Sequence, residues 1–295
     1  MQFKYFSIRE IQNFINENNL AIHKKYSQNF LINSGVVDTI ITFAKIEKEE
    51  LVLEIGCGLG SLTNKLIQTG CTLMGFEVDK AFIKLLKTQF SDNKNFTLIE
   101  GDFLKEIEKT KNEINKTKYK NIKILGNLPY HITTPILDKI FTTPIRFDLI
   151  IFMMQKEVAE RITAKEGTKQ YGSLSIFSQF YSNPKIIAKT SPKSFYPSPK
   201  VDSSLVYFEK QHNKYPVKDK VLFFKIARSI FINRRKQIKN NLLLSPLLKN
   251  IDKDKIIQAL NNSNIPFTIR GEILSIAKIV ELSNELYKII NNDKI

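Results

Sequence analysis

Short apolar runs alternate with helical patterns through the first two thirds of the chain, and no other feature of the sequence restricts the possible folds as strongly. Each run is short enough to be a single strand, and the segments between the runs repeat their apolar residues at helical spacing. Strands that alternate with helices are typical of a parallel sheet covered by helices, so we predict a doubly wound α/β fold. The predicted strands are Leu51–Ile55, Thr72–Glu77, Thr97–Glu100, Ile122–Gly126 and Phe147–Met153.

The other periodic segments suggest how the chain is divided. Helices are predicted at Ser61–Thr69, Lys80–Phe90, Gln155–Ala164 and Leu174–Tyr181, and a hairpin at the sheet edge is predicted from Lys185–Thr190 and Val201–Glu209. Beyond the polar segment Lys210–Asp219 only helical patterns follow, at Val221–Leu243, Asp252–Asn261 and Arg270–Asn291. We therefore predict an N-terminal extension (1–22), a sheet-containing domain (23–210) and a small all-helical domain (211–295).

The charge of the chain restricts its partners. Basic residues outnumber acidic ones, 45 against 29, and the net charge is +16. Residues 211–295 hold 16 of the basic residues and only 7 acidic ones, so the excess is concentrated in the predicted helical domain. Such an excess on a folded protein favours a polyanion, either nucleic acid or an anionic membrane, as partner.

The sequence gives no sign of secretion or membrane insertion. Its first residues lack the apolar core of a signal peptide, and the longest apolar run, Leu149–Met154, is too short to cross a bilayer. Cys57 and Cys71 are too few for a disulfide framework and form no metal-spaced cluster with the three histidines. We therefore expect a cytoplasmic protein without a metal site.

A glycine-rich turn joins the first predicted strand to the helix that follows. It runs from Gly56 to Gly60 with glycine at every second position. Glycines permit a tight turn and a close approach to a ligand, and the N–H groups of the helix N-terminus bind polar atoms. Glu77 ends the second strand, where a carboxylate can accept both ribose hydroxyls, and Asp102 follows the third strand. These features predict a nucleotide-binding cradle at one edge of the sheet.

The spacing of the glycines distinguishes between two cofactors. The dinucleotide motif G-x-G-x-x-G would need glycine at position 61, where this chain has Ser61, so NAD is the second choice. The segment Glu54–Gly60 has the form E-x-G-x-G-x-G, which resembles the first motif of S-adenosylmethionine-dependent methyltransferases. This resemblance implies a Rossmann-like methyltransferase domain that binds S-adenosylmethionine, with Glu77 at the ribose and Asp102 at the adenine amine.

A second motif, Asn127-Leu128-Pro129-Tyr130, follows the fourth strand and resembles the (N/D/S)-P-P-(Y/F) tetrad of methyltransferases that act on exocyclic amines. An adenine N6 amine is a poor nucleophile because its lone pair is delocalised into the ring. The side-chain oxygen of Asn127 and the carbonyl oxygen of Pro129 are the predicted acceptors of its two N–H groups, which would direct the lone pair at a methyl donor. Tyr130 is predicted to stack on the extruded base, and Phe195 to form a second stacking face.

Further segments, in order along the chain, are similar to one family, the ribosomal RNA adenine dimethyltransferases, and to its small-subunit branch. They lie between about Lys24 and Leu286 and include Lys25–Leu31, Phe76–Asp79, Gln155–Arg161, Phe195–Ser203 and Arg234–Lys236. The resemblance implies that the cofactor is bound by Asn29, Leu31, Gly56, Glu77, Asp102 and Asn127. It also implies a substrate, two adjacent adenosines in the 3′-terminal hairpin loop of 16S rRNA, each methylated twice during biogenesis of the small ribosomal subunit. We expect a monomer.

The predicted helix Val221–Leu243 contains no acidic residue, and its basic residues recur at helical spacing. Either it is an amphipathic helix with a solvated basic side, or its basic face contacts phosphates. A-form RNA exposes phosphates and hydroxyls more readily than base edges, so such a surface would recognise shape while the pocket selects the base. The predicted RNA-binding residues are Lys225, Arg228, Arg234, Arg235, Lys236 and Lys239.

Three other functions share part of this pattern. An enzyme of the antibiotic-resistance type would methylate adenine of 23S rRNA with a similar tetrad, and a DNA adenine methyltransferase would act on a duplex. A non-catalytic ribosome-assembly factor would bind the subunit without the chemistry. The intact tetrad Asn127–Tyr130 and the intact acids Glu77 and Asp102 argue against this last alternative.

Overall fold

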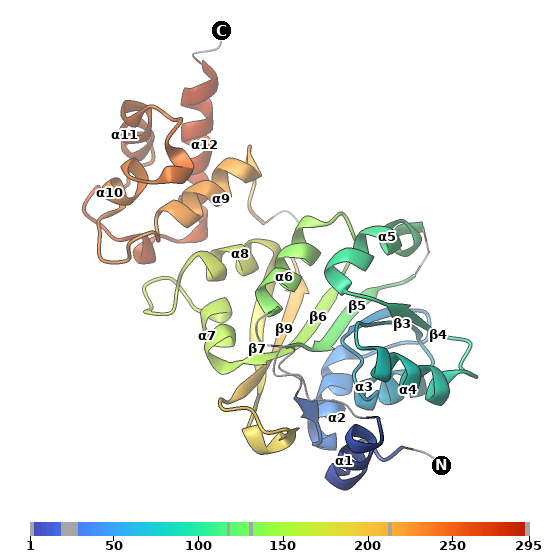
Figure 1. Cartoon of the computed structure of the whole chain (residues 1–295). Helices are drawn as coiled ribbons and strands as arrows, with labels where there is room; N and C mark the ends of the chain where they lie inside the picture. The colour runs from blue at the N-terminus through green and yellow to red at the C-terminus, as the bar shows by residue number, and fades with distance from the viewer. Residues whose placement is uncertain (1–2, 19–28, 117–118, 130–131, 212–213, 293–295) are drawn as a thin grey trace. The chain divides into compact units, whose positions relative to one another are not determined.

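The structure is a computed structural model that describes residues 3–18, 29–116, 119–129, 132–211 and 214–292. The chain forms two compact units, of which unit 1 comprises residues 1–159 and 185–210, and unit 2 comprises residues 160–184 and 211–295 (Figure 1). The division predicted at residue 210 differs from this one, because residues 160–184 group with the C-terminal helices. Their side chains Tyr171, Ile176 and Phe180 are buried in the core of unit 2.

Unit 1 is built on a seven-stranded sheet with the order β4-β3-β2-β5-β6-β9-β7 (Figure 1). The strands are β2 (Leu51–Ile55), β3 (Thr72–Glu77), β4 (Phe96–Glu100), β5 (Ile122–Asn127), β6 (Leu149–Gln155), β7 (Ser182–Thr190) and β9 (Ser203–Lys210). Strands β2 to β6 pair in parallel, and β9 runs antiparallel to β6. The five predicted parallel strands are present within two residues of their predicted ends, and the α/β fold is confirmed.

The central strands are apolar because the sheet is covered on both faces. Every residue of β2 is buried, as is every residue of β5 before Asn127. On one face, Val37 and Leu66 pack with Val52, Leu125 and other strand residues in one core cluster. The helices next to the sheet in unit 1 are α2 (Ser34–Ala44), α3 (Ser61–Gln68), α4 (Lys80–Phe90), α5 (Phe103–Lys116), α6 (Thr133–Thr142) and the first half of α7 (Lys156–Thr163).

The strand order reverses at β2, which lies between β3 and β5. The connection that leaves β2 therefore runs toward β3 and β4, whereas the chain later returns to the other side of β2 to form β5 and β6. A crevice opens beyond the carboxyl ends of the strands at such a reversal, and ligands of open α/β sheets bind there.

Two short strands and an N-terminal helix complete unit 1. Strand β1 (Phe30–Leu31) pairs antiparallel with β8 (Phe195–Tyr196), so that Leu31 is opposite Phe195. A single turn of 3-10 helix, Pro192–Ser194, precedes β8. Ser7 caps the N-terminus of helix α1 (Ile8–Glu17), and its hydroxyl oxygen accepts a hydrogen bond from the Glu10 N–H. The predicted extension thus contains an ordered helix.

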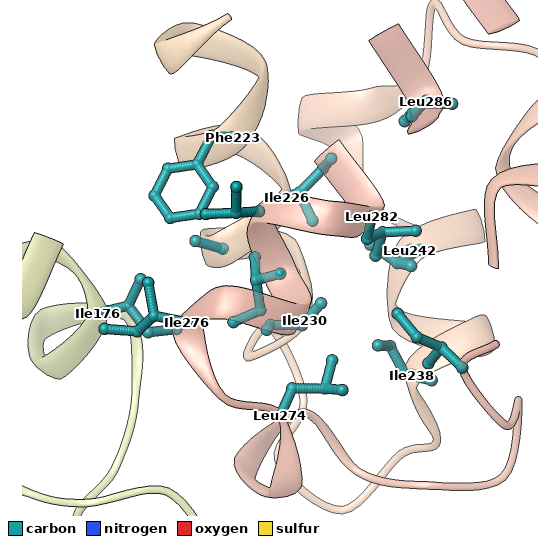
Figure 2. Close-up of a cluster of buried hydrophobic side chains, with 14 of the residues drawn as sticks. Ile176, Phe223, Ile226, Ile230, Ile238, Leu242, Leu274, Ile276, Leu282 and Leu286 are labelled. Carbon is teal, nitrogen blue, oxygen red and sulfur yellow. The ribbon is translucent and has the colours of Figure 1, made fainter. Parts of the chain in front are cut away.

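Unit 2 is helical and has a core of its own. Its helices are α8 (Ser173–Tyr181), α9 (Lys220–Ser229), α10 (Ile238–Leu243), α11 (Lys253–Asn262) and α12 (Ile276–Asn292), with 3-10 turns at Pro246–Leu248 and Gly271–Ile273. Figure 2 shows side chains of α8, α9, α10 and α12 that together form this core, among them Ile176, Phe223, Leu242 and Leu282. The apolar stripe of each helix is therefore buried within the unit.

Two predicted helices of unit 2 are corrected by the structure. The helix predicted at Val221–Leu243 is wrong as one continuous segment, since α9 ends at Ser229 and α10 starts at Ile238. The helix predicted from Arg270 starts only at Ile276. In both places the sequence pattern is helical over its whole length, but tertiary contacts hold part of the segment in a non-helical conformation.

A buried asparagine accounts for the first correction. The Asn241 amide nitrogen donates to the carbonyl oxygens of Ile230 and Asn233, each at 2.9 Å, and its side-chain oxygen accepts from the Asn233 N–H at 3.2 Å. These bonds satisfy backbone groups that a continuous helix would have paired internally. Gly271 lies against the same connection, where a Cβ atom would come within 2.6 Å of the Ile230 oxygen.

Candidate active site

A cavity of about 500 Å³ opens at the crevice beyond β2. This volume is within the range of small-molecule sites, about 300–1,000 Å³. Its wall is formed by β1, the glycine turn and the segments that follow β3, β4 and β5. The predicted site residues that line it are Asn29, Leu31, Gly56, Glu77, Asp102, Asn127 and Pro129. Residues far apart in the sequence are therefore brought together at one place.

The glycine turn forms the floor of the cavity. Gly56 has a φ of +74°, and a Cβ atom placed there would have no atom within 4 Å, so the backbone is open to a ligand at this point. Gly60, with a φ of +88°, precedes α3 and lies so close to the Phe90 ring that a Cβ atom would be 3.0 Å from it. Gly56 thus leaves room for a ligand, and Gly60 permits close packing of the turn on α4.

Glu77 is held by backbone N–H groups at the end of β3. Its two carboxyl oxygens accept hydrogen bonds from Gly58 at 2.7 Å, Val78 at 2.8 Å and Asp79 at 2.9 Å. Burial raises the pKa of Glu77, while the three backbone donors act in the opposite direction. The carboxyl group is therefore fixed beside the glycine turn, in the position that a ribose-binding acid requires.

A second buried acid lies below the turn. Glu54 accepts a hydrogen bond from the Thr63 hydroxyl at 2.7 Å, and burial raises the pKa of Glu54 to about 8. The neighbouring thiol of Cys57 is also buried, and burial raises its pKa well above the ordinary value, so this cysteine is a poor nucleophile. In the ranges that the structure describes, no group of histidine, cysteine and acidic side chains could hold a metal ion.

Asp102 and the residues after it form another part of the wall. The Asp102 side chain is exposed at the cavity, and its Oδ1 accepts a hydrogen bond from the Leu104 N–H at 3.0 Å. This bond resembles a helix cap at the start of α5 and fixes the direction of the carboxylate. Phe103 is buried beside it and meets the Phe76 ring edge-on, with centroids 5.0 Å apart.

The catalytic candidate Asn127 is oriented by a contact with Asn29, the residue that precedes β1. Its amide nitrogen donates a hydrogen bond to the Asn29 carbonyl oxygen at 3.0 Å. This bond fixes how the amide is turned, and the side-chain oxygen, which is the acceptor atom of the group, can then accept from a substrate. Asparagine at the last position of a buried strand thus presents an acceptor at the cavity.

The rest of the tetrad is only partly described. The Pro129 carbonyl oxygen accepts hydrogen bonds from the Ile132 N–H at 3.1 Å and from the Thr133 hydroxyl at 3.5 Å. The hydroxyl can rotate to another acceptor, so a substrate N–H would take the place of this longer bond. Tyr130, the predicted stacking residue, lies outside the described residues.

Phe195 does not occupy the position predicted for it. Its side chain is only 3% exposed and packs with Leu31 and Leu205 in the core below the sheet, and it does not line the cavity. The reason is the alternation of side chains along β8, which directs Phe195 into the core while Tyr196 is partly exposed. In this structure Phe195 supports β1 and forms no stacking face.

Several cavity residues were not predicted from the sequence. Val78 directly follows Glu77, and Lys105 stands three positions after Asp102, so both could have been found from the acids, since residues after strand ends share the same edge. Tyr5 and Phe82 also line the cavity. Nothing in the local sequence connects these two aromatic residues with the glycine turn, because the contacts join distant segments.

Unit 2 carries the predicted RNA-binding residues on three segments. Lys225 and Arg228 are exposed on α9, and Arg235 and Lys236 are exposed in the connection between α9 and α10. Lys239, on α10, lies over the Phe267 ring at 4.9 Å. These residues therefore do not form the single helical face that was predicted.

Arg234 differs from its neighbours because its guanidinium group is engaged within unit 2. It donates to the carbonyl oxygens of Lys169 at 2.6 Å and Tyr171 at 2.8 Å, and it pairs with Glu272 at 3.4 Å. These contacts tie residues 169–171 to the connection that carries Arg235. The contacts of Arg234 indicate that it stabilises the fold of unit 2.

A family model described as "Ribosomal RNA adenine dimethylase" matches residues 19–282. A protein named ribosomal RNA small subunit methyltransferase A from Halothermothrix orenii is 39% identical over 95% of this chain and 93% of its own length. A Clostridium botulinum protein of the same name is 40% identical, over 94% and 98%.

A solved structure is also similar. A dimethyladenosine transferase from Plasmodium falciparum superimposes with a TM-score of 0.75 at 25% identity, covering 87% of this chain and 97% of that chain. Within the part of the chain that the structure describes, no helix is both long enough and apolar enough to cross a membrane.

Proposed function

The chain belongs to the ribosomal RNA adenine dimethylase family, and from this premise we propose that it dimethylates the N6 amines of two adjacent adenosines in the 3′-terminal hairpin loop of 16S rRNA. As a member of that family it is an S-adenosylmethionine-dependent methyltransferase of ribosomal RNA adenine. Support for the small subunit as substrate comes from the names of relatives that are 39% and 40% identical. The reaction would take place on the maturing subunit in the cytoplasm.

The observation that carries this proposal is the hydrogen bond from Asn127 to the Asn29 carbonyl oxygen. It directs the Asn127 side-chain oxygen at the place where an amine must donate, next to the cavity that contains Glu77 and the glycine turn. An adenine N6 amine has two N–H groups, and the second can donate to the Pro129 carbonyl oxygen in place of the long bond from the Thr133 hydroxyl. Two acceptors fixed in this way favour a tetrahedral nitrogen whose lone pair is directed at the methyl donor.

The residues of the cavity fit the cofactor. The open backbone at Gly56 leaves room for the methionine part, Glu77 presents carboxyl oxygens for the ribose hydroxyls, and Asp102 presents one for the adenine amine. When bound, S-adenosylmethionine supplies an electrophilic methyl group on its sulfonium sulfur. The contribution of the protein is to hold the amine in line with that methyl group and to exclude water.

The two methylations place different demands on the acceptors. Before the first transfer the amine has two N–H groups, and the Asn127 side-chain oxygen and the Pro129 carbonyl oxygen would accept one each. Before the second, the amine retains a single N–H, so one acceptor is sufficient. After each transfer the positively charged nitrogen releases a proton readily to water, and no strong base is required.

Unit 2 would hold the folded RNA by its phosphates. Lys225, Arg228, Arg235 and Lys236 are exposed and positively charged, which suits non-sequence-specific contact with an RNA backbone. Arg234, although exposed, would act through its hydrogen bonds within unit 2, by fixing the connection that presents Arg235 and Lys236. Recognition of shape and selection of the base would then be performed by different parts of the chain.

Labelled S-adenosylmethionine and immature small subunits that lack the modification would test this function. We expect label at N6 of neighbouring adenosines near the 3′ end of 16S rRNA, mapped by nuclease digestion and mass spectrometry. Transfer to 23S rRNA and none to small subunits would overturn the substrate assignment in favour of the antibiotic-resistance type. Transfer to duplex DNA alone would indicate a DNA adenine methyltransferase.

A further inference from the structure

Helix α1 packs behind the wall of the cofactor cavity. Ile11, with 0% of its surface exposed, and Ile15 form one apolar cluster with Phe30, Leu59 and Phe82. Those last three residues also line the cavity. They therefore lie between the cavity and α1, so the helix supports the surface against which the cofactor would bind.

Aromatic contacts extend this packing from α1 to β1. Phe14 stacks on Phe82 with ring centroids 6.3 Å apart, and Phe82 meets Phe30 edge-on at 5.3 Å. Gln12 donates a hydrogen bond from its amide nitrogen to the Tyr196 hydroxyl at 3.1 Å. Helix α1 thus contacts both strands of the two-stranded sheet, and one of these strands contains the lining residues Phe30 and Leu31.

Tyr5, which precedes α1, reaches the cavity directly. Its buried ring packs with Cys57 of the glycine turn and with Leu86 and Phe90 of α4. Its hydroxyl donates to the side-chain oxygen of Gln89, which is 84 positions away. Tyr5 is therefore held at the wall next to the turn that would bind the methionine part of the cofactor.

The wall and the helix depend on each other. Helix α1 has ten residues, and isolated helices shorter than about 12–15 residues are marginal in water. Its stability must therefore come from the cluster around Ile11, and the same cluster positions Phe30, Leu59 and Phe82.

We propose that residues 3–17 are part of the cofactor site, with Ile11 and Ile15 as positioning residues for its aromatic wall and Tyr5 as a wall residue. This segment lies before residues 19–282, which the family model matches. The inference rests on S-adenosylmethionine as the cofactor, but it does not depend on which RNA is methylated.

Calorimetric titration of the full-length protein with S-adenosylhomocysteine tests the proposal. Ile11→Asp places a charge in the cluster and is expected to raise the dissociation constant at least about tenfold. The matched control is Ile8→Asp, on the same helix but 43% exposed, which should leave the constant within about twofold. In steady-state kinetics, Ile11→Asp should raise KM for the cofactor, while KM for RNA stays within about threefold.

Tyr5→Ala provides a second, independent variant in case Ile11→Asp does not fold, and circular dichroism identifies that case. We expect Tyr5→Ala to weaken S-adenosylhomocysteine binding about fivefold to tenfold, and Tyr5→Phe, which keeps the ring, to weaken it less. Folded Ile11→Asp or folded Tyr5→Ala protein with the wild-type dissociation constant would overturn the proposal. Wild-type protein that binds the ligand but does not methylate small subunits would overturn only the function proposed above.

Discussion

The side-chain nitrogen of Asn127 donates a hydrogen bond to the main-chain oxygen of Asn29 at 3.0 Å, across 98 positions of the sequence. This contact joins the residue that would accept the target amine to the segment that leads into β1 and lines the cofactor cavity. A change in how β1 is seated would therefore alter the direction of the Asn127 amide. If the proposed roles of these residues hold, this hydrogen bond would couple cofactor binding to base positioning.

Substitution of Asn127 should slow methyl transfer. In Asn127→Ala the acceptor is lost, and we expect kcat to fall by about 10²–10³, the usual cost of removing one pre-organised hydrogen-bonding group. Asn127→Asp keeps an acceptor but places an oxygen against the Asn29 carbonyl, so its kcat should lie between those of wild type and Asn127→Ala. Single-turnover methylation of small subunits measures this order, with Asn261→Ala, an exposed asparagine of α11, as the control. Equal rates for Asn127→Ala and wild type would contradict the mechanism.

Glu77→Ala should both weaken cofactor binding and lower the stability of unit 1. The substitution leaves the N–H groups of Gly58, Val78 and Asp79 without their carboxylate acceptor and removes the ribose contact. We expect the S-adenosylhomocysteine dissociation constant to rise about 10- to 100-fold, and the free energy of unfolding to fall by roughly 1–3 kcal/mol. Calorimetry and urea denaturation measure the two effects. Glu281→Gln, an exposed glutamate of α12, should change neither, and unchanged ligand affinity in Glu77→Ala would remove Glu77 from the site.

The stability of the protein should respond to the ionisation of Glu54. Burial raises the folded-state pKa of Glu54 from 4.5 to about 8, so the folded protein binds this proton more tightly than the unfolded chain between those two pH values. The stability that Glu54 contributes is therefore present below pH 4.5 and is lost as the pH rises through 8, at up to about 1.4 kcal/mol per pH unit. In Glu54→Gln the carboxyl group that binds this proton is replaced by an amide, which does not titrate.

Urea denaturation of wild type and Glu54→Gln at pH 5.5, 7 and 8.5 tests this pH dependence. We expect the stability of Glu54→Gln relative to wild type to increase with pH, because the neutral amide carries no ionisation cost. A difference between the two proteins that is constant over this pH range would show that Glu54 does not titrate there.

The adjacent arginines of unit 2 should respond differently to the same substitution. Arg235→Gln removes an exposed charge, so RNA affinity should fall and the slope of log K against log salt should decrease by about 1. Arg234→Gln breaks the contacts to Lys169 and Tyr171, so we expect an unchanged slope and a loss of roughly 1 kcal/mol of stability. Filter binding to a 16S rRNA hairpin at several salt concentrations, together with thermal unfolding, distinguishes them. A reduced slope for Arg234→Gln would mean that it contacts phosphate.

The sequence alone was sufficient to predict the parallel strands and the positions of the glycine turn and of the acids Glu77 and Asp102 at the strand ends. A strand of a parallel sheet is buried on both faces, so it stands out in the sequence as a short, nearly continuous apolar run. Residues that follow the carboxyl ends of such strands lie along the same edge of the sheet. Local pattern therefore carries this information, and the cavity at Gly56 follows from it.

Only the tertiary structure decided the features that depend on contacts between distant segments. Asn241 interrupts a segment whose local pattern is helical, Arg234 binds carbonyl groups more than sixty positions away, and Phe195 points into the core because of its pairing with Leu31. The docking of α1 behind the cavity is of the same kind. A hydrogen bond or a packed side chain between distant residues leaves no periodic trace in either segment, so these features become visible only when the chain is folded.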